Sequence, residues 1–180
     1  MTLSKIEEIL KEDGTPKKLF LPQGLVIPFI RYKKILRLRI RRTNPGEYSK
    51  YHIVSGSLMH PFRTRYFDEK TAIIVESELD AILLSQEIHE DVLIIALGAV
   101  RIRPDKKLAD ILDGMDHILI SLDNDEAGNR EYNDFWKVNF PQSYQHDVPD
   151  NYGKDPTEAL LNGLDLYKWY MDGIEVSKQS

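Results

Sequence analysis

Four acidic residues after position 70 have the types and positions that metal-dependent phosphoryl transfer requires. Glu76 ends the apolar run TAIIVE, and Asp123 ends HILISLD, with Asp125 two residues further on. Asp155 stands later, in YGKDPTEAL. Carboxylates that crowd together repel one another unless a divalent cation lies among them. The pattern therefore predicts a metal site that acts on phosphate esters.

Each of these acids also has an ordinary structural interpretation. Asp125 or Glu126 would cap the helix that follows, Asp155 would cap a helix beginning at Pro156, and Glu76 would be a surface residue after a buried strand. The strand-end positions favour a shared site, because ligands of open α/β sheets bind beyond the carboxyl ends of the strands. The spacing is compatible with a phosphatase or a receiver-like domain as well.

The composition restricts which cation such a site can bind. The chain of 180 residues has no Cys, which excludes disulfides and thiolate-bound zinc, and its five His are scattered without the spacing of metal ligands. Oxygen ligands suit Mg²⁺ or Mn²⁺. Two-metal phosphoryl transfer uses such cations, about 3.5–4 Å apart, to activate the attacking oxygen and to stabilise the leaving one.

The elements that must position these acids alternate from residue 71 onward. Apolar strands are expected at 71–76, 92–98 and 117–123, with a short fourth one near 143–148. Helices are expected at 79–88, 108–115, 127–140, from Pro156, and at about 165–172. Near-continuous Ile, Val and Leu strands between helices are typical of a parallel sheet that is buried on both faces. The fold class is therefore α/β.

The first part of the chain has a different pattern. A helix is expected at about 3–12, and β-rich segments at 25–30, 35–43 and 50–56 are separated by turn residues, as in an antiparallel meander. Residues 1–70 hold 15 Lys or Arg against 7 Asp or Glu, a net charge of +8, whereas residues 71–180 hold 9 against 22, a net charge of −13. We expect two domains: a basic β-rich N-terminal subdomain over 1–70 and a catalytic domain with C-terminal helices over 71–180.

The basic character concentrates in one strand and its turn. Seven of the twelve residues from 31 to 42 are Lys or Arg, and alternate residues of a strand share a face at about 6–7 Å spacing, which matches successive phosphates. The alternative is a solvated strand face. The residues expected to bind nucleic acid are Lys33, Lys34, Arg37, Arg39, Arg41 and Arg42. No run of about 18 apolar residues predicts a membrane span, so a soluble, cytoplasmic protein without a membrane partner is expected.

Two signatures resemble those of the Toprim domain. IIVESELDAILLSQE (73–87) has its strand ending in Glu before a helix, and HILISLDNDEAG (117–128) has its Asp-x-Asp motif. ALGAV (96–100), the GKDP motif (153–156) and the preceding basic β-segments are similar to primases of bacteria, phages and mobile elements. The resemblance covers roughly residues 19–172. It implies a Toprim, Rossmann-like parallel sheet with flanking helices, preceded by a small β-rich subdomain.

The resemblance also implies residue roles. Glu76 matches the general acid or base, or a metal ligand; Asp123 and Asp125 match the metal-binding pair; and Asp155 matches a further acidic ligand. Asp80, in ESELD, matches the aspartate of the first helix and completes the expected catalytic set. Ser77 departs from the family, where a glycine is usual in primases.

The function that the resemblance implies is Mg²⁺- or Mn²⁺-dependent DNA primase activity: a nucleotidyltransferase that makes primers from NTPs on a single-stranded DNA template during DNA replication. A helicase or a zinc-binding domain, in trans or on a longer chain, is a further implied partner. Two alternatives remain open, a Toprim nuclease of the overcoming-lysogenization-defect type and a non-catalytic module that binds nucleic acid.

Overall fold

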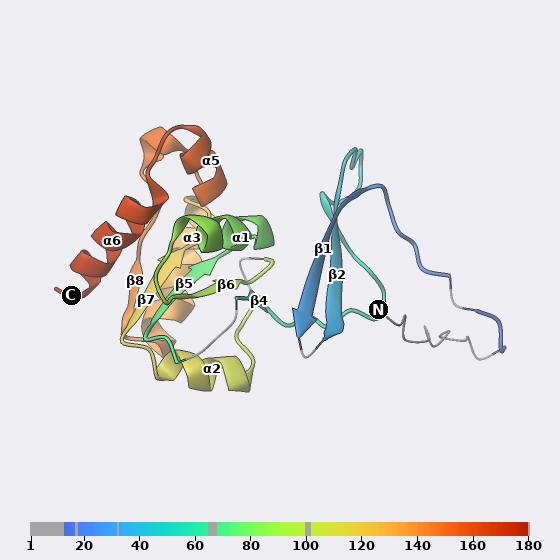
Figure 1. The fold of residues 1–180 in the computed structure, drawn as a ribbon, viewed down its shortest axis with the longest axis horizontal. Coiled ribbons are helices and arrows are strands. Elements are labelled where there is room, and N and C mark those ends of the chain that lie inside the picture. The colour runs from blue at the N-terminus through green and yellow to red at the C-terminus, as the bar shows by residue number, and fades with distance from the viewer. Residues whose placement is uncertain (1–12, 17, 32, 65–67, 100–101, 180) are drawn as a thin grey trace. The chain divides into compact units, whose positions relative to one another are not determined.

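The computed structural model describes residues 13–16, 18–31, 33–64, 68–99 and 102–179, and separates into two compact units, residues 1–59 and 60–180 (Figure 1). The helix expected at 3–12 lies outside the described residues. The units divide eleven residues before the expected domain boundary, because a short strand near residue 62 pairs with the second sheet. The functional division at residue 70 stays a prediction.

The first unit contains an antiparallel sheet of three strands in the order β1-β2-β3. Its strands are β1 (Gly24–Arg31), β2 (Lys34–Arg42) and β3 (Tyr51–Ile53). Lys33, in the turn between β1 and β2, has a positive φ of 61°. Ile27 and Phe29 are buried on one face of this sheet, and Ile40 is buried on the other. The predicted antiparallel meander is confirmed.

The second unit is built on a five-stranded sheet with the order β4-β6-β5-β7-β8. The strands are β4 (Phe62–Arg63), β5 (Thr71–Val75), β6 (Leu93–Ala96), β7 (His117–Ser121) and β8 (Ser143–Gln145). The last four run parallel, and only β4 pairs antiparallel, with β6. Together with the flanking helices, this confirms the predicted α/β class. Strand β4 was not expected, since two residues are too short for a periodic signal.

Helices cover both faces of the parallel sheet. On one face, Ile73 and Val75 of β5 contribute to a core with α1 (Glu78–Glu87), α5 (Pro156–Leu161) and α6 (Leu166–Ser177). On the other face, Ile74 and its neighbours pack with α2 (Lys106–Asp113) and with the helical segment that follows β7. Burial of alternate residues on both faces explains why the strands read as continuous apolar runs.

The helix expected at 127–140 has an irregular middle. It consists of α3 (Glu126–Glu131), a π-helical turn η1 (Tyr132–Trp136) and α4 (Lys137–Asn139). Through this segment Phe135, Trp136 and Phe140 contact one another, with ring centroids 5.3–6.2 Å apart, and Trp136 is fully buried. π-turns are frequent at functional sites, and this one follows the helix that begins at the Asp-x-Asp motif.

A 3₁₀ turn, η2 (Asp150–Tyr152), precedes the GKDP motif. Within the ranges described above, no helix has both the length and the apolar character that a bilayer span needs.

Candidate functional site

The carboxyl ends of β5 and β7 bring two of the predicted acids to one edge of the sheet. These strands are parallel neighbours, with Val75 opposite Ser121. Glu76 is the next residue after β5, and Asp123 follows β7 by two residues, so both leave the sheet at the same edge. The backbone N–H of Gly98, beyond the end of β6, donates to the Glu76 carbonyl at 2.8 Å and ties a third strand end to this edge. This is the position where open α/β sheets bind ligands.

Asp125 closes a tight turn and caps α3. Its backbone N–H donates to the Asp123 carbonyl at 2.7 Å, and its Oδ1 accepts from the N–H groups of Ala127 and Gly128, both at 2.9 Å. The capping interpretation of Asp125 is therefore confirmed. Because both bonds end on Oδ1, a cation can still be bound through Oδ2.

Gly128 lets α3 lie against the backbone of Asp123. A Cβ at this position would be 2.3 Å from the Asp123 carbonyl oxygen and 3.3 Å from the Cβ of Leu122. The obstacle is backbone, which cannot rotate away as a side chain can. The glycine of the DNDEAG run thus fixes the position of the turn that presents Asp123.

Lys154 already places a cation at Asp123. Its Nζ lies 3.1 Å from the Asp123 Oδ2, and its carbonyl accepts from the backbone N–H of Asn124 at 3.1 Å. The hydrogen bond and charge of Asp123, followed by the charges of Asp155 and Glu158, raise the pKa of Lys154. The GKDP motif therefore lies beside the Asp-x-Asp turn, although the two are about thirty residues apart in the sequence.

Asp155 caps α5 in the same way as Asp125 caps α3. Its Oδ1 accepts from the backbone N–H of Glu158 at 2.8 Å, directly before Pro156 in the first turn. The capping alternative is confirmed here too. Asp155 is close enough to Lys154 and to Asp80 for its charge to act on both.

Asp80 is only 4% exposed and joins two helices. Ser77 Oγ donates to one carboxylate oxygen at 2.5 Å, while the backbone N–H and Oγ of Thr157 donate to the other at 3.2 and 2.5 Å. Burial raises the pKa of Asp80. These contacts give Asp80 a positioning role between α1 and α5. They also explain Ser77, whose hydroxyl caps α1 by accepting from the Asp80 N–H.

The four predicted metal ligands are not gathered into one group. Among residues 13–179 that the structure describes, no three His, Asp or Glu side chains lie close enough to share a metal ion. Asp125 and Asp155 each use Oδ1 as a helix cap, and Lys154 balances part of the charge of Asp123. The donor types still fit Mg²⁺, which commonly binds through one or two carboxylates, water and substrate phosphates. Glu76 and Asp123, at one sheet edge, are the pair that would hold it, and the full set remains a prediction.

The predicted nucleic-acid contacts differ in exposure. Arg37 and Arg39 are 3% and 8% exposed, opposite the buried Phe29 and Ile27 in the β1–β2 register, and the Arg39 guanidinium lies 4.0 Å from the centre of the Tyr51 ring. Lys33, Lys34 and Arg41 are exposed, and Arg42 is partly exposed. A polyanion can therefore reach the cations at the two ends of β2 directly. The assignment of all six basic residues to nucleic-acid binding stays a prediction.

Sequence reasoning missed three residues that shape this site: Gly128, Lys154 and Thr157. Each stands inside a quoted motif, DNDEAG or GKDPTEAL, and the motif was the available signal. Their individual roles depend on contacts across the sheet edge, which spacing does not specify.

A family model described as Toprim-like matches residues 73–160. No curated protein sequence matches the chain significantly. Among solved structures, the primase fragment of the bacteriophage T7 primase-helicase protein is similar with a TM-score of 0.53 at 16% identity, over 83% of this chain and 61% of that one. The Aquifex aeolicus primase, with its zinc-binding and RNA polymerase domains, is similar with a TM-score of 0.56 at 19% identity.

That likeness covers 81% of this chain and 38% of the Aquifex chain, so this chain spans well under half of it. A small TOPRIM domain protein from Bacillus stearothermophilus is 22% identical over 59% of this chain and 86% of that one, with a TM-score of 0.44. At these identities the two primase structures show a shared fold. The matches to the two primase structures cover 83% and 81% of this chain, so they extend beyond residues 73–160 and include part of the region before that segment.

Proposed function

We propose, on the premise that residues 73–160 form a Toprim-like domain resembling primase cores, that this protein performs metal-dependent phosphodiester chemistry on nucleic acid, and specifically synthesises primers on a single-stranded DNA template. The observation that carries the proposal is the arrival of Glu76 and Asp123 at one edge of the parallel sheet. The exposed cations of the first unit, Lys33, Lys34 and Arg41, support a polyanionic partner.

Each residue at the sheet edge has a part in the proposed chemistry. Asp123 and Glu76 would hold Mg²⁺ or Mn²⁺, which would supply charge neutralisation at the reacting phosphate and lower the pKa of an attacking hydroxyl. Asp125 fixes the turn that presents Asp123 and adds a ligand through Oδ2. Lys154 balances part of the charge of Asp123 before substrate binds, and we propose that it contacts the phosphates of the incoming nucleotide once a metal ion displaces it.

Primer synthesis requires NTPs and a template as substrates. The two primases with a similar fold support these as the reactants, and one of them is a fragment of a primase-helicase protein. We therefore propose a helicase, or a zinc-binding domain in trans or on a longer chain, as the partner that supplies template. Purified single-stranded template removes the need for such a partner in a first assay.

The test is template-dependent primer synthesis with labelled NTPs, Mg²⁺ or Mn²⁺, and a set of single-stranded templates. Wild type is compared with Asp123→Asn and Glu76→Gln, and with Asp110→Asn as the control, since Asp110 is an exposed carboxylate of α2 away from the sheet edge. We expect short products from wild type and the control, and a loss of 100-fold or more in the two site variants.

Two other results would replace the proposal. Metal-dependent cleavage of the labelled template, without product extension, would assign the site to a nuclease. Template binding by wild type without synthesis or cleavage under either metal would assign the protein to non-catalytic binding.

A further inference from the structure

Two adjoining pockets lie at the end of the antiparallel sheet in the first unit. The first, of about 500 Å³, is lined by Phe20, Pro22, Gln23, Arg42, Asn44 and Tyr48. The second, of about 470 Å³, is lined by Leu25, Arg41, Arg42, Thr43, Pro45 and Lys50. Both volumes fall in the range of small-ligand sites, roughly 300–1,000 Å³. Arg42 belongs to both, so the pockets meet at this side chain.

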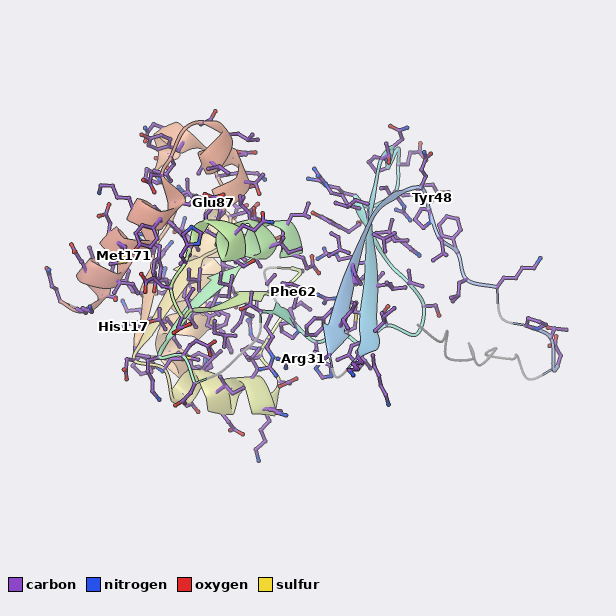
Figure 2. All side chains as sticks on the ribbon, viewed as in Figure 1. Arg31, Tyr48, Phe62, Glu87, His117 and Met171 are labelled. Atoms are coloured by element: carbon purple, nitrogen blue, oxygen red, sulfur yellow. The ribbon has the colours of Figure 1, made fainter. Side chains whose placement is uncertain are left out.

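The first pocket has the side chains that bind a nucleobase. Phe20 and Tyr48 are 66% and 76% exposed, so each ring keeps accessible surface for stacking beside its contact within the unit, which is His52 for Phe20 and Arg42 for Tyr48. The Arg42 guanidinium lies 5.2 Å from the centre of the Tyr48 ring and donates to the Ser49 carbonyl at 2.6 Å, which holds it in place. Gln23 and Asn44 add amide groups that can donate to and accept from a base edge. Figure 2 shows Tyr48 near one end of the β1–β2 hairpin and Arg31 near the other.

The second pocket has the side chains that bind phosphate. Arg41 and Lys50 are exposed, and together with Arg42 they give it three cations. The one acidic residue between positions 41 and 50 is Glu47. Bases that stack on aromatic rings and phosphates that contact neighbouring Lys and Arg are the combination by which proteins bind single strands.

We propose that these two pockets form a binding site for one nucleotide unit of a single-stranded nucleic acid, with the base against Phe20 and Tyr48 and an adjacent phosphate at Arg41 and Lys50. The inference rests on the proposed function, which it deepens by giving the template a second point of attachment on the first unit. A continuing strand is favoured over a free nucleotide, because the exposed cations of this unit extend past the pockets to Lys33 and Lys34 at the other end of β2.

The test measures binding of a fluorescent oligothymidylate by anisotropy in EDTA, so that no catalysis takes part. Stacking on one aromatic ring is worth roughly 5- to 150-fold in affinity. We expect Tyr48→Ala and Phe20→Ala each to weaken binding by at least about fivefold, and Tyr48→Phe to bind like wild type. Tyr167→Ala, a partly exposed tyrosine of α6 in the other unit, is the control and should bind unchanged.

Salt dependence separates the two pockets. Each phosphate contact to a single strand contributes about 0.7 to the slope of log affinity against log salt concentration. Arg41→Gln and Lys50→Gln should each lower the steepness of that slope by about this amount, whereas Tyr48→Ala should leave the slope unchanged. Circular dichroism of every variant checks that the unit is folded.

Unchanged affinity in both Tyr48→Ala and Phe20→Ala would overturn the inference, as would displacement of the oligonucleotide by an equal concentration of a free nucleoside triphosphate. The outcome is separate from that of the primer assay. Asp123→Asn should abolish synthesis and keep wild-type binding, so the loss of either result alone identifies which proposal has failed.

Discussion

Gly128→Ala is expected to impair catalysis far more than folding. The added Cβ would lie 2.3 Å from the Asp123 carbonyl oxygen, whereas real Cβ atoms essentially never come nearer than 3.0 Å to another heavy atom. The turn and the start of α3 must therefore separate by at least about 0.7 Å. Asp123 and Asp125 both belong to this turn, so the displacement is transmitted directly to the proposed metal ligands.

The effect on stability is the balance of two terms. Overpacking in a well-packed region destabilises the folded state by about 1–3 kcal/mol, whereas alanine in place of glycine within a helix stabilises it by about 1 kcal/mol. The net destabilisation is about 0–2 kcal/mol, which corresponds to a fall in Tm of about 0–8 °C for a chain of this size. A misplacement near 1 Å at a catalytic group can lower the rate about 100-fold. We therefore expect a 10- to 100-fold loss of primer synthesis in a protein that is still folded at assay temperature.

Thermal unfolding and the primer assay are run on the same preparations. Gly114→Ala is the matched control, since its Cβ would meet only the Ile111 carbonyl at an ordinary 3.5 Å. Activity of Gly128→Ala within twofold of wild type would refute the reasoning, because the turn would then tolerate a shift of the acids. A loss of activity that merely follows unfolding, with Tm below the assay temperature, would refute it as well.

Three further predictions concern other contacts. Lys154→Ala should raise the affinity for Mn²⁺ by about 1.4- to fivefold, because a partly exposed ion pair worth about 0.2–1 kcal/mol no longer competes for Asp123. The affinity is measured by electron paramagnetic resonance, and weaker Mn²⁺ binding would contradict this prediction. Asp80→Ala should lower the free energy of unfolding by about 1–3 kcal/mol, because the hydroxyls of Ser77 and Thr157 lose their acceptor. Asp80→Asn should lower the free energy of unfolding by less. Equal Tm values for the two variants would argue against a hydrogen-bonding role of Asp80. Burial lowers the pKa of His146, so below about pH 6.5 the unfolded chain binds more protons than the folded chain, and stability is lost as the pH falls. His146→Gln should therefore make Tm depend less on pH between pH 7 and 5. An unchanged slope of Tm against pH would exclude His146 as the cause.

The second unit was largely predictable because its strands have a strong local signal. The runs at 71–75, 93–96 and 117–121 are buried on both faces, so almost every residue is apolar and the strand reads clearly. The turn chemistry was equally local, since Asp125 and Asp155 act on N–H groups two or three residues away. Strand β4 and the π-turn depend on pairing and packing with distant residues, and neither leaves a periodic pattern.

The site was predictable in its members more than in its arrangement. Glu76 and Asp123 both follow parallel strands, so the predicted α/β class placed them at the same edge of the sheet. That their strands are direct neighbours is known from the observed strand order, which the sequence pattern did not specify. The capping of Asp125 and Asp155 competes with metal binding, and the outcome depends on backbone geometry that spacing leaves open. In the basic strand, alternation correctly placed Arg37, Arg39 and Arg41 on one face, but it did not reveal that Arg37 and Arg39 are buried, because burial is set by what covers the face.

The most direct test of the central claim is a crystal structure of the protein with Mn²⁺ and its anomalous signal. We expect a peak bonded to the carboxylates of Asp123 and Glu76, with Lys154 Nζ displaced from its present distance of 3.1 Å to the Asp123 Oδ2. A crystal saturated with Mn²⁺ in which Lys154 keeps that contact, and in which no Mn²⁺ lies at this edge of the sheet, would exclude Asp123 and Glu76 as the metal-binding pair.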